Sequence, residues 1–225
     1  MAVHDGHRAR KKEQFREYGL DTFADHEALE LLLYYAIPRA DTNPVAHRLL
    51  ERFGSLDGVF SAPAQELKNV DGVGESAATL LSLVFPLVRR ARISASKDPV
   101  ILSSTEAAGE FFKNLFFGLR DEHLYEACLD AKGKLLRCKL VAAGSVDTVA
   151  VNLRKIVEYA FQCNASAVIL AHNHPSGLAL PSKEDNTMTI LANEALRSVG
   201  ITLIDHIVVA DDDYVSSRHN GLLHF

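Results

Sequence analysis

An apolar, β-branched run that leads into two histidines limits the folds open to this chain more than any other stretch. Residues 167–170 are typical of a buried strand. Because successive side chains of a strand point to opposite faces, His172 and His174 share one face. After a loop, Ser182 is a predicted helix N-cap, and Asp185 falls in the first turn of that helix. The two imidazoles can therefore bind a single ion.

The candidate donor set consists of two neutral imidazoles and one carboxylate, which suits a divalent metal and zinc best of all. Three protein ligands leave the fourth tetrahedral position to water, as in catalytic rather than structural zinc sites. Two simpler interpretations stay open. A histidine near a strand end is often only a hydrogen-bonded polar residue, and Ser182 with Asp185 can form an ordinary capping box.

The complete motif is more specific than its parts. It has the form His-x-His-Pro followed by Ser-x-x-Asp, and its residues are His172, His174, Pro175, Ser182 and Asp185. This motif resembles the metal motif of the JAB/MPN (JAMM) metallopeptidases. The strings at residues 171–177 and 203–209 resemble the RadC-type branch of that family. The letters His-Asn-His do not indicate an HNH nuclease, whose motif requires a different scaffold.

The resemblance implies a fold, a metal and an activity. The fold is the MPN fold, a cytidine-deaminase-like mixed β-sheet flanked by helices. The metal is one Zn²⁺ per chain, with His172, His174 and Asp185 as its ligands. Zinc would lower the pKa of its water toward neutrality and polarise a scissile carbonyl. The family cleaves peptide or isopeptide bonds, so the expected function is a zinc metallopeptidase acting on a peptide or protein amide.

The resemblance also implies two catalytic residues. JAMM-type sites use a glutamate that takes a proton from the water and delivers it to the leaving amine. Glu122, just ahead of a predicted strand, matches the position of that glutamate in RadC-like sequences. Glu126 has the same strand parity and stays a competing candidate. Ser182 matches a serine that donates to the oxyanion.

Residues 98–225 are expected to form this α/β domain. The predicted elements, in order, are a helix over 104–116, strands over 124–130 and 134–142, a helix over 148–163, a strand from 167, a helix over 182–198, and strands over 201–210 and 214–216. The 182–198 helix is expected to bury Met188, Leu191, Ala195 and Val199. RadC-like chains usually carry His-Pro-Arg-Glu near the start of the 148–163 helix. Residues 151–155 read Val-Asn-Leu-Arg-Lys and keep only the arginine, so the cleft is expected to differ there.

Two polar residues stand within the apolar run of residues 201–210. Asp205 and His206 are expected to be a buried structural pair. The alternative is that they support the metal ligands from behind, as residues around metal sites often do.

Residues 1–97 are expected to form a small all-helical domain that precedes the α/β domain. Gly72, Val73 and Gly74 lie between two amphipathic helices and resemble the hairpin of helix-hairpin-helix modules, in which the backbone approaches a phosphate. Glu75 follows directly and would repel a phosphate. The hairpin is therefore either a nucleic-acid contact or only a tight turn, and a DNA-repair or DNA-processing accessory protein is the alternative function.

The charge distribution argues against strong DNA binding. The net charge is −5, with 13 basic and 13 acidic residues in 1–97, and 11 basic and 16 acidic residues in 98–225. The cluster Arg89, Arg90 and Arg92 is either a basic patch or the dipole-compensating end of a helix. Weak DNA binding and a homodimer stay open as partners. A third possibility is a non-catalytic interaction module whose metal only stabilises the fold.

The cysteine count and the apolar runs predict a compartment. Three cysteines without a close pair favour free thiols in a reducing environment. No run is long and apolar enough to span a bilayer, and the basic N-terminus lacks the apolar core of a signal peptide. A cytoplasmic protein without a membrane partner is expected.

Overall fold

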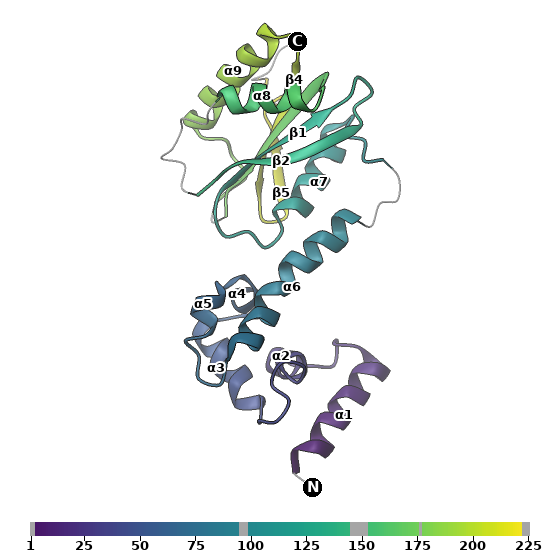
Figure 1. The fold of residues 1–225 in the computed structure, drawn as a ribbon, viewed down its shortest axis with the longest axis vertical. Coiled ribbons are helices and arrows are strands. Elements are labelled where there is room, and N and C mark those ends of the chain that lie inside the picture. The colour runs from purple at the N-terminus through teal and green to yellow at the C-terminus, as the bar shows by residue number, and fades with distance from the viewer. Residues whose placement is uncertain (1–2, 95–98, 145–152, 176, 222–225) are drawn as a thin grey trace. The chain divides into compact units, whose positions relative to one another are not determined.

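The structure, a computed structural model, describes residues 3–94, 99–144, 153–175 and 177–221. The chain divides into two compact units, Met1–Val88 and Arg89–Phe225 (Figure 1). The domain boundary expected at residues 97–98 falls on residues outside the described ranges. Within those ranges, no helix combines the length and the apolar character that crossing a lipid bilayer requires.

The first unit is helical, as predicted. Its elements are α1 (Val3–Tyr18), α2 (Asp25–Leu33), α3 (Asn43–Phe53), α4 (Leu56–Ser61), α5 (Ala64–Leu67) and the first part of α6 (Glu75–Ser94). Leucines at helical spacing fill its core, including Leu29, Leu33, Leu49 and Leu81, none of which is accessible to solvent. Gly54 ends α3 with a positive φ of 82°, which explains why the helix ends there.

The second unit contains a five-stranded sheet with helices on both faces. Its elements are α7 (Thr105–Phe116), β1 (His123–Leu129), β2 (Leu135–Ala143), α8 (Leu153–Gln162), β3 (Ala167–Asn173), α9 (Lys183–Ser198), β4 (Thr202–Ala210) and β5 (Asp213–Ser216). The strand order is β2-β1-β3-β4-β5, in which β3 and β4 are parallel and the other neighbours are antiparallel. The prediction of a mixed α/β sheet flanked by helices and preceded by a helical region is confirmed.

Each face of this sheet carries its own apolar core. Leu124, Val168 and Leu170 pack toward α8 and α9, whereas Ala127 and Ile169 pack toward α7. Figure 1 shows α7 on one side of the sheet and the pair α8–α9 on the other. Since His172 has the same parity as Val168 and Leu170, its side chain lies on the face covered by α8 and α9.

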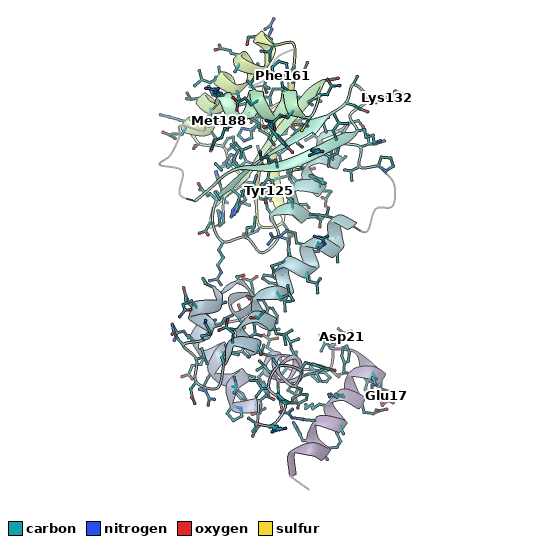
Figure 2. All side chains as sticks on the ribbon, viewed as in Figure 1. Glu17, Asp21, Tyr125, Lys132, Phe161 and Met188 are labelled. Atoms are coloured by element: carbon teal, nitrogen blue, oxygen red, sulfur yellow. The ribbon has the colours of Figure 1, made fainter. Side chains whose placement is uncertain are left out.

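The buried face of α9 differs from the prediction. Met188, Ala192 and Leu196, spaced four residues apart, are the side chains that pack against the sheet. Leu191 and Val199 are exposed instead, at 45% and 37%. Figure 2 labels Met188 on this helix and Phe161 on α8. The sequence offered two apolar stripes that share Met188, and tertiary packing selected the one that continues through Ala192 and Leu196.

Candidate metal centre

One crossover between parallel strands brings the predicted ligands together. His172 lies near the end of β3, His174 follows that strand, and Asp185 stands in the first turn of α9. Their candidate ligand atoms all lie within 4.8 Å of one another. His172 Nε2 is 2.9 Å from His174 Nε2 and 3.3 Å from Asp185 Oδ1, and His174 Nε2 is 3.5 Å from Asp185 Oδ2. This donor set could hold a metal ion.

The electrostatics of the centre stabilise positive charge between these side chains. Burial opposes ionisation of Asp185, but its interactions with the neighbouring His172 and His174 rings and with Ser182 outweigh burial and hold the pKa of that carboxyl below its ordinary value. The hydrogen bond to Asp185 raises the pKa of His174 above its ordinary value, and the charge of Glu122 adds to this effect. A divalent cation fits such a site for the same reason.

Ser182 and Asp185 form the capping box that was one of the open interpretations. Ser182 Oγ accepts from the Asp185 amide at 3.0 Å, and the Ser182 amide donates to Asp185 Oδ2 at 2.7 Å. The Ser182 hydroxyl also donates to Oδ2, at 2.6 Å. The box engages Oδ2 and leaves Oδ1 free of these bonds, so capping and metal binding are compatible. The hydroxyl has one hydrogen, and contact with an oxyanion would require it to turn away from Asp185.

The side chains of Asp205 and His206 lie on opposite faces of the sheet and are both buried, and the His206 amide donates to Asp205 Oδ1 at 2.8 Å. Asp205 accepts from the Ser216 hydroxyl at 2.6 Å and from the Arg218 amide at 3.0 Å, which anchors β5 and the residues after it. His206 is completely buried behind His172, with 2.8 Å between His206 Nε2 and His172 Nδ1. Burial holds the pKa of His206 well below its ordinary value, and the neighbouring His172 lowers it further.

Thr189, which the sequence did not single out, lies next to His206 on the side away from His172. Its Oγ1 lies 2.5 Å from His206 Nδ1 and 2.6 Å from the carbonyl oxygen of Asp185, one turn earlier on α9. Threonine is only a modest helix former, yet Thr189 is fully buried within α9. Its burial is known only from the structure, so no signal in the sequence marks its role.

Glu122 immediately precedes β1, next to the candidate metal ligands. Its Oε2 is buried, has no hydrogen-bond partner among the described residues, and its charge acts on His174. The segment is held by Asn173, the residue between the two histidines: Oδ1 accepts from the His123 amide at 2.8 Å, and Nδ2 donates to the Asp121 carbonyl at 3.1 Å. Asn173 is 4% exposed, and its role could not be seen in the sequence.

Glu126 has a different environment. Its side chain is completely buried in β1, and burial raises its pKa to about 8. Oε1 lies 3.6 Å from Cys128 Sγ, and Oε2 has no partner among the described residues. Glu122, by contrast, is one of the groups whose charge raises the pKa of His174.

The glycine hairpin in the first unit has the conformation of a tight turn. Gly72 has a φ of 89°, and a Cβ there would lie 2.7 Å from Val45 Cγ2, so both conformation and space require glycine. Val73 is buried, whereas a Cβ on Gly74 would meet no atom within 4 Å. Glu75 is 78% exposed in its side chain and forms an ion pair with Lys68 at 2.9 Å. Nucleic-acid binding by this hairpin stays a prediction.

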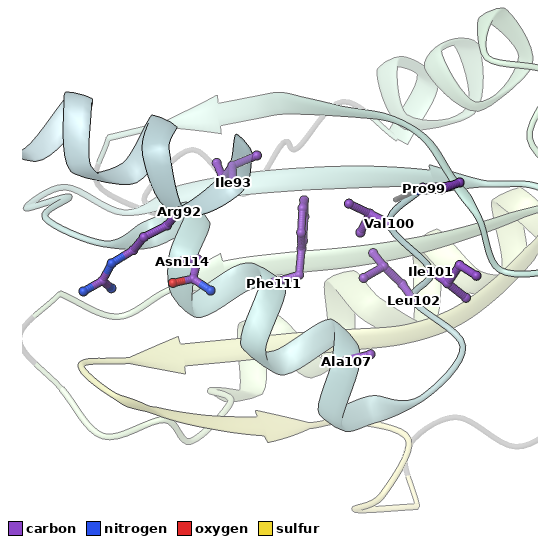
Figure 3. Close-up of a pocket in the computed structure, with 9 residues that line it drawn as sticks. All are labelled: Arg92, Ile93, Pro99, Val100, Ile101, Leu102, Ala107, Phe111 and Asn114. Carbon is purple, nitrogen blue, oxygen red and sulfur yellow. The ribbon is translucent and has the colours of Figure 1, made fainter. Parts of the chain in front are cut away.

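A separate pocket of about 270 Å³ lies beside α7 (Figure 3). Apolar side chains such as Phe111 and Leu102 line it, together with Arg92 and Asn114. Among the described residues that line it, none is a carboxylate, imidazole or thiol that could act as a general base or metal ligand. The candidate metal centre is therefore the better functional site.

Comparisons with known proteins agree with this fold. The family described as "RadC-like JAB domain" matches residues 102–222. A UPF0758 protein of Fusobacterium nucleatum is 34% identical over 225 residues, which cover 97% of each chain. A UPF0758 protein of Ruegeria pomeroyi is 36% identical over 217 residues, covering 96% of this chain and 97% of the relative. The matched domain contains Glu122 and all three candidate ligands.

Proposed function

Because the chain belongs to the RadC-like JAB family, we propose that it is a zinc-dependent hydrolase of peptide or isopeptide bonds. The observation that carries this proposal is the convergence of three metal-donor atoms beside a buried carboxylate oxygen that has no partner among the described residues. The candidate ligands and the candidate base belong to three parts of the chain: the end of β3, the start of α9 and the residue before β1. The fold, and not one short segment of sequence, brings them together.

The residues present fit a zinc ion. His172 and His174 turn their Nε2 atoms toward each other, and Asp185 lies beside both with its carboxyl ionised. Three protein ligands of this type are the usual set of a catalytic zinc site. A zinc ion held there would supply a Lewis acid for the amide carbonyl and would make water more acidic.

Glu122 is the proposed proton carrier. A general base must have an oxygen that is available to accept the proton. The charge of Glu122 acts on His174, and Glu122 Oε2 has no hydrogen-bond partner among the described residues. It would take a proton from the attacking water and transfer it to the leaving amine. Asn173 fixes the backbone on both sides of Glu122 and thereby limits where the carboxylate can lie. Glu126, buried within the strand, is the weaker candidate.

The loop between the ligands gives a first indication of the substrate. Leu178 and Leu180 are 75% and 59% exposed, and the Leu178 carbonyl accepts a hydrogen bond from His174 Nδ1 at 3.2 Å. Two exposed leucines beside the centre favour a substrate that has an apolar side chain near the scissile amide. A polyanionic substrate would be disfavoured by the acidic balance of residues 98–225.

The test combines metal analysis of the purified full-length chain with a cleavage screen against peptide and isopeptide libraries. We expect one zinc per chain and cleavage of at least one amide that stops when a chelator removes the metal. Retained zinc without cleavage of any library member would favour a non-catalytic module whose metal stabilises the fold. Absence of zinc after reconstitution would reject the proposed centre itself.

A further inference from the structure

A row of four groups runs from the helix backbone to the candidate metal centre. It consists of the Asp185 carbonyl, the Thr189 hydroxyl, the His206 ring and the His172 ring, separated by 2.6, 2.5 and 2.8 Å. Thr189 and His206 are 1% and 0% exposed. At these distances a hydrogen lies between each pair of atoms, and the direction of each bond can be worked out.

The carbonyl group of Asp185 determines which atom donates in the first two hydrogen bonds of this row. A carbonyl oxygen can only accept, so the single hydrogen of the Thr189 hydroxyl is donated to Asp185. Thr189 Oγ1 must then accept at 2.5 Å, and the donor is His206 Nδ1–H. The ring of His206 is completely buried, and no carboxylate of the described part of the chain bonds to it, so the ring is neutral and has one N–H.

The same reasoning continues to the metal ligand. Because the hydrogen of His206 is on Nδ1, its Nε2 carries a lone pair and accepts from His172 Nδ1–H. Nε2 of His172 is then left without a hydrogen, and it is this atom that faces His174 and Asp185. A metal ligand requires such a lone pair.

We propose that Thr189 and His206 are positioning residues that hold His172 in the Nδ1–H tautomer, so that Nε2 is ready to bind the metal. The inference rests on the proposed function only in naming zinc as the ion. A helix carbonyl thereby specifies, through two side chains, which nitrogen of His172 is available. Without the Thr189 hydroxyl, His206 can turn or change tautomer, and His172 loses its fixed orientation.

The test uses Thr189→Val in the full-length chain, which keeps the shape and removes the hydroxyl. Thr187→Val is the matched control, because Thr187 also donates to a carbonyl one turn earlier, at 2.9 Å to Lys183, yet is exposed. Thr189→Ser, which restores a hydroxyl, is the conservative variant. Zinc affinity is measured by competition with a chromophoric chelator. We expect about 10–100-fold weaker binding for Thr189→Val, with Thr187→Val and Thr189→Ser near wild type.

A second measurement does not depend on metal binding. Long-range ¹H–¹⁵N correlation spectra of the metal-free protein report which ring nitrogen carries the hydrogen. We expect His172 as the Nδ1–H tautomer in the wild type and a mixture in Thr189→Val. Equal zinc affinity for Thr189→Val and Thr187→Val, or an Nε2–H tautomer in the wild type, would overturn the inference. A wild type that shows the expected tautomer but binds no zinc would leave the inference standing and reject the metal proposal.

Discussion

The carboxamide of Asn173 holds Glu122 through the peptide groups on both sides of it. Asn173 Oδ1 accepts a hydrogen bond from the His123 amide, and Asn173 Nδ2 donates one to the Asp121 carbonyl. The residue between the two candidate ligands therefore fixes the candidate base. The candidate ligands and the candidate base are therefore coupled by the side chain of Asn173, which is not itself a candidate ligand.

Asn173→Ala should keep its zinc and lose hydrolysis. Removing the carboxamide frees the backbone around Glu122, and a displacement of about 1 Å at a reacting group can cost about 100-fold in rate. Turnover of a substrate from the cleavage screen and zinc content are measured together, with circular dichroism as a check of folding. Asn114→Ala, which removes an amide bonded to the Glu110 carbonyl in α7, is the control. Wild-type turnover in Asn173→Ala would show that β1 alone positions Glu122.

Glu122→Gln should separate chemistry from metal binding. The substitution keeps the size of the side chain and removes its basic oxygen, so zinc should be retained. Hydrolysis should fall by about 2–4 orders of magnitude, the usual contribution of general acid–base catalysis. Glu126→Gln should have little effect on turnover. Near-normal turnover in Glu122→Gln would move the role to Glu126 or elsewhere, and loss of zinc would make Glu122 a ligand.

His174→Ala should lose most of the metal. It removes one of three candidate ligands and leaves the buried His172 and Asp185 in place. Elemental analysis of the purified variant is compared with His219→Ala, which removes an exposed histidine outside the centre. Full zinc occupancy in His174→Ala would rule out the ligand assignment.

Glu126 should make the stability of the protein depend on pH. Its pKa in the folded state is about 8, above its ordinary value of 4.5, so the folded state binds more protons than the unfolded state between these values. Its contribution to stability is therefore present at low pH and is lost as the pH rises toward 8, by at most about 1.4 kcal/mol per pH unit. Urea unfolding of metal-free wild type and Glu126→Gln at pH 5.5 and 8.5 tests this. A stability difference between them that does not change with pH would contradict it.

DNA binding should be weak and should disappear near physiological salt. Residues 1–97 have no formal net charge, and Glu75 lies at the hairpin where a phosphate would approach. Electrophoretic shifts of duplex DNA with the full-length chain, at rising salt, provide the measurement. Tight binding that persists at physiological salt would show that the backbone of the hairpin outweighs the charge.

The fold class could be predicted because local patterns and packing agree. The apolar strand before His172, the cap at Ser182 and the stop at Gly54 all act within a few residues. The prediction of which face of α9 is buried was wrong, because that helix has two apolar stripes. Only contact with the sheet decides that Met188, Ala192 and Leu196 are the buried residues. Other boundaries moved by a residue or two, because the ends of helices and strands fray. The predicted start of the 148–163 helix lies outside the described residues.

The candidate site was predictable in its ligands but not in the residues around them. The sequence motif names His172, His174 and Asp185, which the structure brings together. Thr189 and Asn173 act through bonds to residues far away in the chain, and a single sequence gives no sign of such partners. The different partners of the Asp205 and His206 side chains likewise follow from the packing on the two faces of β4, which the sequence alone does not reveal.

The β3–α9 crossover also has a consequence for the order of assembly. All three candidate ligands lie between residues 172 and 185, so the chain closes only a short loop to bring them together. Glu122 reaches the centre from a distant part of the sequence and arrives only when β1 pairs with β3. Contacts at short sequence separation form sooner in folding than distant ones. We therefore expect the three candidate ligands to come together before Glu122 is in place when the full-length chain refolds.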